Sequence, residues 1–196
     1  LFENIQNAYE GGASVFDNIT KDDLILAFFP CIYFSCISAV WFSLTQRDYK
    51  TWPVQKIIDN IIDRNKKRST FFELLNKLCA IALKKGFRLI IENPWSENHF
   101  LKFGFLKPPT LVDKNRTVRG DFFVKPTAYW FWNCEPTSGQ SFQQPKMKKN
   151  ILYSRQAKET GMCSEERSMI SPDYARNFIC DFILGKKQDI GQLSLF

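Results

Sequence analysis

Two reactive side chains follow short apolar runs that have the composition of buried strands. Cys31 comes shortly after Leu24–Phe29 (LILAFF), and Glu92 comes directly after Phe87–Ile91 (FRLII). Ligands of α/β sheets bind beyond the carboxyl ends of parallel strands, so we expect the two side chains to converge there. A thiol at a helix start suits a nucleophile, and Glu92 suits a proton donor or hydrogen-bond partner. The structural alternative is a buried apolar Cys and a simple loop carboxylate.

The segment between these runs has the spacing of helices. Apolar residues at helical intervals predict one helix over about Pro53–Ile62 and a second over Thr70–Lys84, with Gly86 ending it. Both apolar runs lack the alternation of a half-exposed strand, which predicts burial on both faces. Strand, helices and strand form a right-handed βαβ unit.

The second half of the chain has a different pattern of predicted elements. It predicts a short helix from Ser96 to Phe103, strands at Thr110–Val112 and Ala128–Asn133, a loop over Glu135–Lys149 and a last helix over Pro172–Leu184. The aromatic run in the second of these strands is expected to be core. The predicted fold is therefore α/β, a parallel sheet with an antiparallel hairpin, divided into residues 1–134, 135–165, 166–185 and 186–196.

Composition excludes several classes of protein. The chain has 196 residues, of which 44% are apolar, enough for the core of one domain of ordinary size. No apolar run is long enough to cross a bilayer and no basic-apolar leader opens the chain, so we expect a cytoplasmic protein without membrane contact. Six dispersed Cys and one His, His99, predict no metal site, and His99 is expected to be a surface or structural residue.

The charge balance favours a polyanionic partner. The net charge is +7, and Arg64–Arg68 reads RNKKR, although a solvated helix end explains that run equally well. Arg116, Arg119 and Lys125 surround the Asp121–Phe123 segment in a stretch expected to face the same sheet edge. We expect phosphate contacts from these three cations, with a solvated hairpin as the alternative.

Two segments carry a resemblance to a known family. Asp17-Asn18-Ile19-Thr20 precedes Asp23–Cys31 (DLILAFFPC) and Tyr33-Phe34-Ser35, and after a helical crossover comes Ile91-Glu92-Asn93-Pro94. The order and spacing of these segments resemble the cytosine-C5 DNA methyltransferases over about residues 15–95. The resemblance implies an S-adenosylmethionine-dependent methyltransferase fold that acts on double-stranded DNA with the target base flipped out.

The resemblance also implies roles for individual residues. Cys31 matches the nucleophile that adds to C6 of cytosine, and Glu92 matches the acid at N3. Asp17, Ile19 and Pro30 match segments around S-adenosylmethionine, and Ser35 matches a position near the target backbone. Residues 135–165 correspond to the variable region that reads DNA sequence in the family.

The chain departs from the family at several points. No strand with a Gly-rich cofactor loop precedes Asp17, Ile32 and Pro94 replace the usual Gln and Val, and Arg116-Thr117-Val118-Arg119 is the nearest match to a Gln-x-Arg-x-Arg segment. Two interpretations follow: the downstream part of a methyltransferase, or a degenerate relative that binds DNA without methylating it. A third is another thiol-dependent enzyme that uses Cys31 and Glu92.

The final residues carry a separate motif. Gln192, Leu193, Ser194, Leu195 and Phe196 resemble the peptide by which bacterial polymerases and repair proteins dock onto the ring-shaped sliding clamp. The polar stretch before them would let the peptide extend, whereas the alternative is that its apolar residues fold back onto the core. The motif predicts a clamp partner and a location at the nucleoid of a bacterial or phage-host cytosol.

Overall fold

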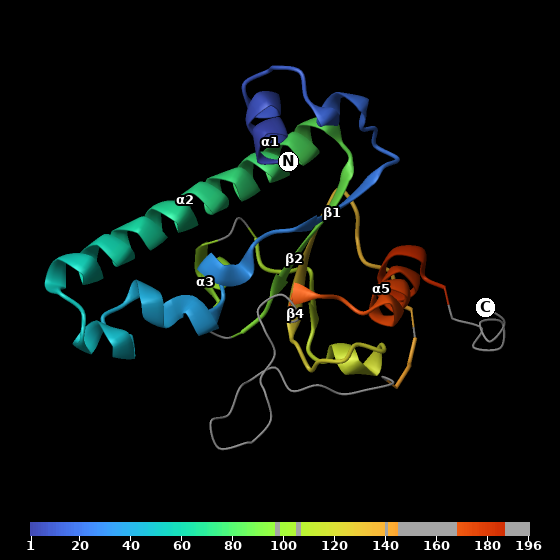
Figure 1. Ribbon diagram of the computed structural model, residues 1–196. Coiled ribbons are helices and arrows are strands. Elements are labelled where there is room, and N and C mark those ends of the chain that lie inside the picture. Colours follow the sequence, from blue (N-terminus) through green and yellow to red (C-terminus); the bar gives the residue numbers. More distant parts are fainter. Residues whose placement is uncertain (97–98, 105–106, 140, 145–167, 187–196) are drawn as a thin grey trace. The chain divides into compact units, whose positions relative to one another are not determined.

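The computed structural model describes residues 1–96, 99–104, 107–139, 141–144 and 168–186, without the side chains of residues 36 and 37. Within these ranges the chain forms two compact units. The first unit comprises residues 1–112 and 128–135, and the second comprises residues 113–127 and 136 onward. The ribbon in Figure 1 follows the chain through both units.

The sheet contains four strands in the order β1-β2-β4-β3. They are β1 (Leu24–Phe28), β2 (Arg88–Pro94), β3 (Leu111–Asp113) and β4 (Thr127–Trp132). β1 and β2 are parallel, and the remaining pairings are antiparallel. The predicted α/β class, parallel strand pair and antiparallel hairpin are therefore confirmed, in a mixed sheet.

The prediction that the LILAFF run is buried on both faces is wrong. Ala27 and Phe29 are buried, whereas Leu26 is 38% exposed and Phe28 is 56% exposed. The reason is its position, since β1 is the outermost strand of the described sheet. β2 lies between β1 and β4, and its residues 89–93 are all buried, as expected of a central strand.

The prediction of two separate crossover helices is also wrong. A single helix, α2, runs from Val54 to Lys85 and ends at Gly86, whose φ of 81° is the left-handed conformation that glycine adopts easily. The polar stretch in the middle contains no Gly or Pro, and it is bridged by the ion pair of Asp63 with Lys67. Helical geometry therefore continues through it.

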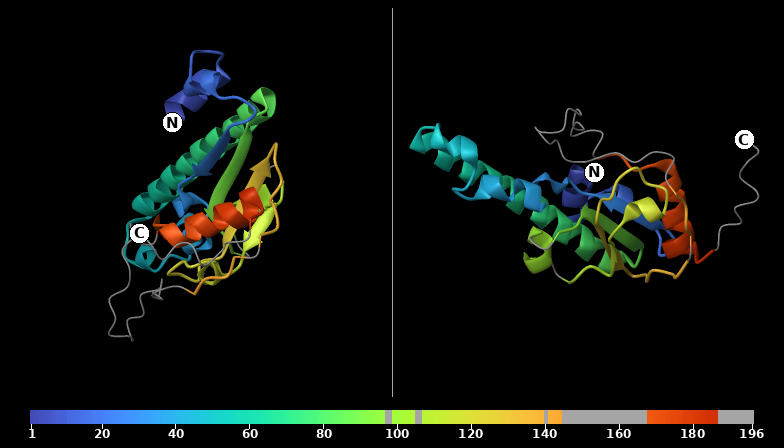
Figure 2. Two further views of the ribbon diagram at one scale, coloured as in Figure 1. Left: turned by 90° about the vertical axis from the view of Figure 1, so that its right-hand side faces the viewer. Right: turned by 90° about the horizontal axis from the view of Figure 1, so that it is seen from below.

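The core of the first unit lies between α2 and the strands. It includes residues from the carboxyl-terminal half of α2, from three strands and from the short helix α1 (Phe2–Tyr9): among them Ile5, Leu75, Leu78, Ala27, Leu89, Ile91 and Trp130. The amino-terminal half of α2 reaches past the strands (Figure 2), where 3-10 helices η3 (Cys36–Phe42) and η4 (Arg47–Lys50) lie beside it.

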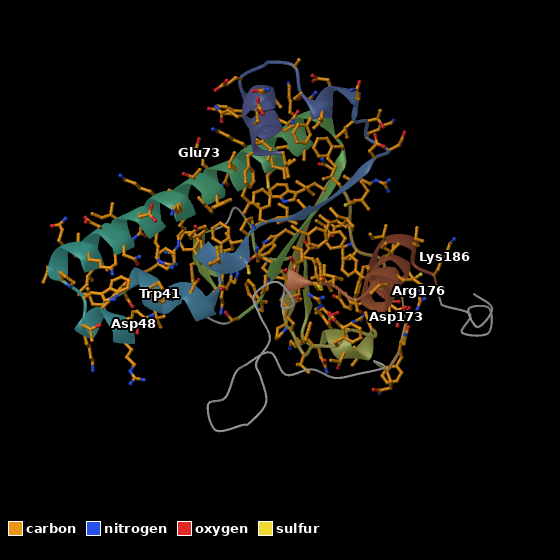
Figure 3. All side chains as sticks on the ribbon, viewed as in Figure 1. Trp41, Asp48, Glu73, Asp173, Arg176 and Lys186 are labelled. Carbon is orange, nitrogen blue, oxygen red and sulfur yellow. The ribbon has the colours of Figure 1, made fainter. Side chains whose placement is uncertain are left out.

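An aromatic cluster holds η3 and η4 against α2. Trp41, Tyr49 and Trp52 form pairwise ring contacts of 5.5–6.3 Å, and the Tyr49 hydroxyl donates to Asn60 on α2. Figure 3 labels Trp41 and Asp48 at this end of the helix. The long segment between Cys31 and α2 is therefore folded onto the helix.

In the second unit, the predicted last helix is present. α5 spans Pro172–Ile179 and continues as a π-helical turn over Cys180–Leu184. Ser171 caps it, because its hydroxyl accepts a hydrogen bond from the Tyr174 amide at 3.0 Å. A further α-helix of the described residues, α3, covers Phe100–Gly104 in the first unit. No helix in the described ranges combines the length and apolar character needed to cross a bilayer.

Candidate functional site

The carboxyl ends of β1 and β2 lie side by side. Phe28 is the register partner of Glu92, and the Asn93 side-chain amide donates to the Phe29 carbonyl at 3.3 Å. Two residues beyond Phe29 the chain reaches Cys31. The parallel pairing thus brings Cys31 and Glu92 to one edge of the sheet, where both were expected.

Cys31 opens a short 3-10 turn, η2 (Cys31–Tyr33), at the place where a helix start was expected. Its carbonyl accepts hydrogen bonds from the amides of Phe34 and Ser35, both at 2.9 Å. The thiol is reduced and half-buried. These backbone hydrogen bonds fix the turn that carries the sulfur atom.

Glu92 is 8% exposed and comes from the central strand β2. It shares a sheet face with its register partner Phe28, because paired residues of neighbouring strands point to the same side. A nearly buried carboxyl group at a strand end meets a ligand with little competition from water. This is the setting that a hydrogen-bond partner for the edge of a base requires.

A chain of hydrogen bonds from Leu101 through His99 and Asn93 to Phe29 holds the Pro30–Cys31 segment in place. The Leu101 amide donates to His99 Nδ1 at 3.2 Å, so Nε2 carries the proton of the neutral ring and donates to Asn93 Oδ1 at 3.0 Å. Asn93 in turn donates to Phe29. Burial lowers the pKa of His99 to about 4, which keeps the ring neutral at physiological pH. His99 was expected to be a surface or structural residue, and it is a buried structural residue that supports the candidate site.

The segment that follows η2 lines an open cleft. Its volume is about 460 Å³, and it is lined by residues of the η2–η3 segment, α2 and α3: Phe34, Ser35, Ala39, Phe42, Ser43, Arg68, Phe100, Phe103 and Gly104. We call it the aromatic cleft. Ser35, expected near a target backbone, is one of its lining residues.

Arg68 is the cation of the aromatic cleft. Its guanidinium lies 3.3 Å from the Phe42 ring centroid and 4.6 Å from that of Phe100, and its Nε donates to the Tyr33 carbonyl at 2.9 Å. In the part of the chain that the structure describes, no carboxylate pairs with it. Sequence reasoning noted Arg68 only as the end of a basic run, because its position beside Phe42 depends on how the η3 segment folds back.

The residues expected around S-adenosylmethionine are not gathered at one place. Asp17 pairs with Lys85 at 2.7 Å, next to the start of β2, and this lysine lowers the pKa of Asp17. Ile19 packs against the core. Pro30 lies beyond the opposite end of β1, which is five residues and thus about 16 Å long. The segment of Asp17 and Ile19 and the Pro30 position thus lie at opposite ends of β1.

The cations expected to contact phosphate lie in the second unit, and the two arginines form ion pairs there. Arg116 is fully buried and pairs with Asp121, so it cannot reach a phosphate in this structure. Arg119 is 19% exposed and bonds Asp113 and Asp181, both at 2.9 Å. Arg116 is therefore neutralised by Asp121, and Arg119 is neutralised by Asp113 at the end of β3 and by Asp181 in the π-helical turn.

Lys125, the third expected phosphate contact, is half-buried, and its carbonyl accepts from the Thr127 hydroxyl at 3.0 Å. The aromatic run of β4 is core as predicted, since Tyr129, Trp130 and Phe131 are all at most 4% exposed. Gln192, Leu193, Leu195 and Phe196 lie outside the described residues, as does most of the proposed recognition region.

Among the described residues, no cluster of His, Cys, Asp and Glu has the arrangement needed to hold a metal ion. Comparisons with known proteins add no family assignment: no family model matches the chain, and no curated protein matches it. The functional conclusion therefore depends on the site itself.

Proposed function

We propose that this chain is a cytosine-C5 DNA methyltransferase-like protein that attacks a flipped-out cytosine through Cys31. The observation that carries the proposal is the parallel register of β1 and β2, which brings Cys31 and Glu92 to one sheet edge. The resemblance of the segments around both residues supports it, and so does an open cleft whose lining begins at Phe34, three residues after Cys31.

The chemistry of the chain's own residues is a nucleophilic addition. The Cys31 sulfur forms a bond to C6 of cytosine, the C5–C6 double bond breaks, and its electron pair is delocalised toward N3. Glu92 gives a proton to N3, which leaves a neutral enamine that is nucleophilic at C5. Cytosine is a poor electrophile, so the thiolate and the acid have to act together. Neither atom is reachable inside a duplex, which requires base flipping.

The family resemblance implies S-adenosylmethionine as the methyl donor. Asp17 and Ile19 lie at the opposite end of β1 from Pro30. This separation favours a second candidate function, a degenerate module that binds DNA or the sliding clamp without turnover. Calorimetric titration of S-adenosylmethionine separates the two: micromolar binding supports the enzyme, and no heat at high concentration supports the module.

The addition step has its own test. Reversible attack at C6 makes C5 basic, so the C5 hydrogen of cytosine in DNA exchanges with heavy water even without a methyl donor. We expect exchange with the wild-type protein and none with Cys31→Ser. Cys134→Ser is the matched control, since Cys134 is also a half-buried, reduced thiol of the first unit. Equal exchange by both variants would contradict the assignment of Cys31.

The sliding clamp remains a proposed partner through the last five residues. A peptide with this composition would insert Leu195 and Phe196 into an apolar pocket and bring the protein to newly copied DNA. The proposed location, the nucleoid of a bacterial or phage-host cytosol, depends on this contact.

A further inference from the structure

The aromatic cleft has the composition of a site for an unpaired nucleotide. Its walls are phenyl rings, its polar groups are two serines and an arginine, and none of the described lining residues is acidic. Its volume of about 460 Å³ lies within the range of pockets that hold small ligands. Aromatic rings and a cation are also what proteins use to bind single-stranded nucleic acid, through stacking and phosphate contacts.

The guanidinium of Arg68 is preorganised by contacts within the protein. The ring of Phe42 lies against it and the Tyr33 carbonyl accepts its Nε proton, which leaves its outer N–H groups to face a ligand. Burial lowers the pKa of Arg68, so the cation is partly desolvated while it stays charged at neutral pH. A partly desolvated, fixed guanidinium binds a phosphate more strongly than a mobile surface lysine does.

Phe103 supplies a stacking surface at the mouth of the cleft. It is 77% exposed, an unusual position for a large aromatic side chain, and it belongs to the short helix α3. The ammonium of Lys102 lies 5.5 Å from its ring centroid. A base that stacks on Phe103 therefore enters beside a second cation, and the charge of the surroundings complements a phosphodiester.

We propose that the aromatic cleft holds one unpaired nucleotide of a DNA strand, with its phosphate at Arg68 and its base against Phe103. The identity of the polymer rests on the proposed function. The site is distinct from the Cys31–Glu92 pair, which takes the target base, and it would hold a nucleotide next to the target. A free nucleotide offers the same chemistry, so the test includes both sources.

The test measures fluorescence anisotropy of a short labelled single-stranded oligonucleotide. Arg68→Gln and Phe103→Ala should each weaken binding by about fivefold or more, the lower end of what one stacked base contributes. Lys67→Gln removes the same charge one residue away on α2, and Phe142→Ala removes an aromatic side chain that is 62% exposed in the second unit. Both controls should bind as the wild type does.

Two results would overturn the proposal. One is equal affinity of the cleft variants and their controls for the oligonucleotide. The other is a cleft-dependent affinity for deoxycytidine monophosphate alone, with no effect on the oligonucleotide, which would make the cleft a small-molecule site. The C5 hydrogen exchange assay reports the Cys31 chemistry separately. Exchange without a cleft effect rejects only the cleft, and a cleft effect without exchange rejects only the methyltransferase-like chemistry.

Discussion

The imidazole of His99 donates from Nε2 to Asn93 Oδ1 across 3.0 Å, and neither side chain is exposed. The Asn93 side-chain amide in turn donates to the carbonyl of Phe29, which is two residues before the proposed nucleophile. The position of the Pro30–Cys31 turn thus depends on a histidine that has to stay neutral. Protonation at Nδ1 would place two N–H donors, His99 and Leu101, against each other.

His99 should make the protein lose stability as the pH falls. Its pKa is about 4 in the folded chain and about 6.5 when unfolded, so between these values the unfolded chain binds the extra proton. Stability is therefore full above about pH 7, and up to about 3 kcal/mol is lost by pH 4, with no further loss from this group below it. The measurement is urea unfolding against pH.

The titration of His99 can also be observed directly. The chain contains one histidine, so the imidazole C–H resonances in a proton NMR spectrum belong to His99 alone. An apparent pKa near 6.5 in the folded protein would contradict the buried hydrogen-bonded ring.

The thiols should differ strongly in reactivity. Cys79 is 1% exposed, and burial raises its pKa to about 12, so almost no thiolate forms at pH 8. Cys31 is half-buried and lies at the sheet edge. We expect iodoacetamide to modify Cys31 in the native protein while Cys79 reacts only after denaturation, as mass spectrometry of digested protein would show. Modification of Cys31 and Cys79 at the same rate in the native protein would contradict the burial of Cys79.

Arg119 should be needed for stability of the second unit. It bonds Asp113 and Asp181, which are 5% and 0% exposed, and its guanidinium lies 4.7 Å from the Phe182 ring centroid. Arg119→Ala leaves two buried carboxylates without their cation and should cost about 3 kcal/mol in urea unfolding. Lys114→Ala, which removes an exposed cation of the same unit, should change stability by less than about 0.5 kcal/mol. Equal effects of the two changes on the free energy of unfolding would show that the ion pairs of Arg119 do not stabilise the unit.

The last five residues should bind the sliding clamp. Immobilised bacterial clamp is expected to retain the intact protein, and the double change Leu195→Ala with Phe196→Ala should abolish retention because it removes the apolar anchors. Ser194→Ala is the control and should bind normally. Retention of the double variant at the wild-type level would reject the motif.

The parallel pairing of β1 and β2 could be predicted, and the environment of β1 could not. The LILAFF run predicts a strand because its apolar residues are continuous. Whether both faces of that strand are buried depends on the elements that surround it in the folded sheet. Phe28 is exposed because β1 is outermost in the described sheet, and sheet position is a tertiary property. The same holds for α2, whose continuity across residues 63–69 follows from i,i+4 pairing and not from an apolar pattern.

The candidate site was predicted only where it follows from strand ends. Cys31 comes shortly after one apolar run and Glu92 comes directly after the next, so topology brings them to the same end of the two strands. Arg68 is positioned by a contact across a long stretch of chain, its bond to Tyr33, and a pattern in one segment contains no such information. The partners of His99, Asn93 and Leu101, are near it in the sequence, but its burial is a tertiary property. Likewise, nothing near Arg119 in the sequence indicates that Asp181 neutralises it.

The continuity of α2 also determines the size of anything that contacts both Arg68 and Lys85. Arg68 at the aromatic cleft and Lys85 at the Asp17 segment are seventeen residues apart on one unbroken helix, which corresponds to about 26 Å along its axis. No small ligand spans that separation, whereas about seven or eight base pairs of duplex do. A partner that touches both regions is therefore a polymer, and its length can be mapped by shortening a DNA duplex until contact with one end is lost.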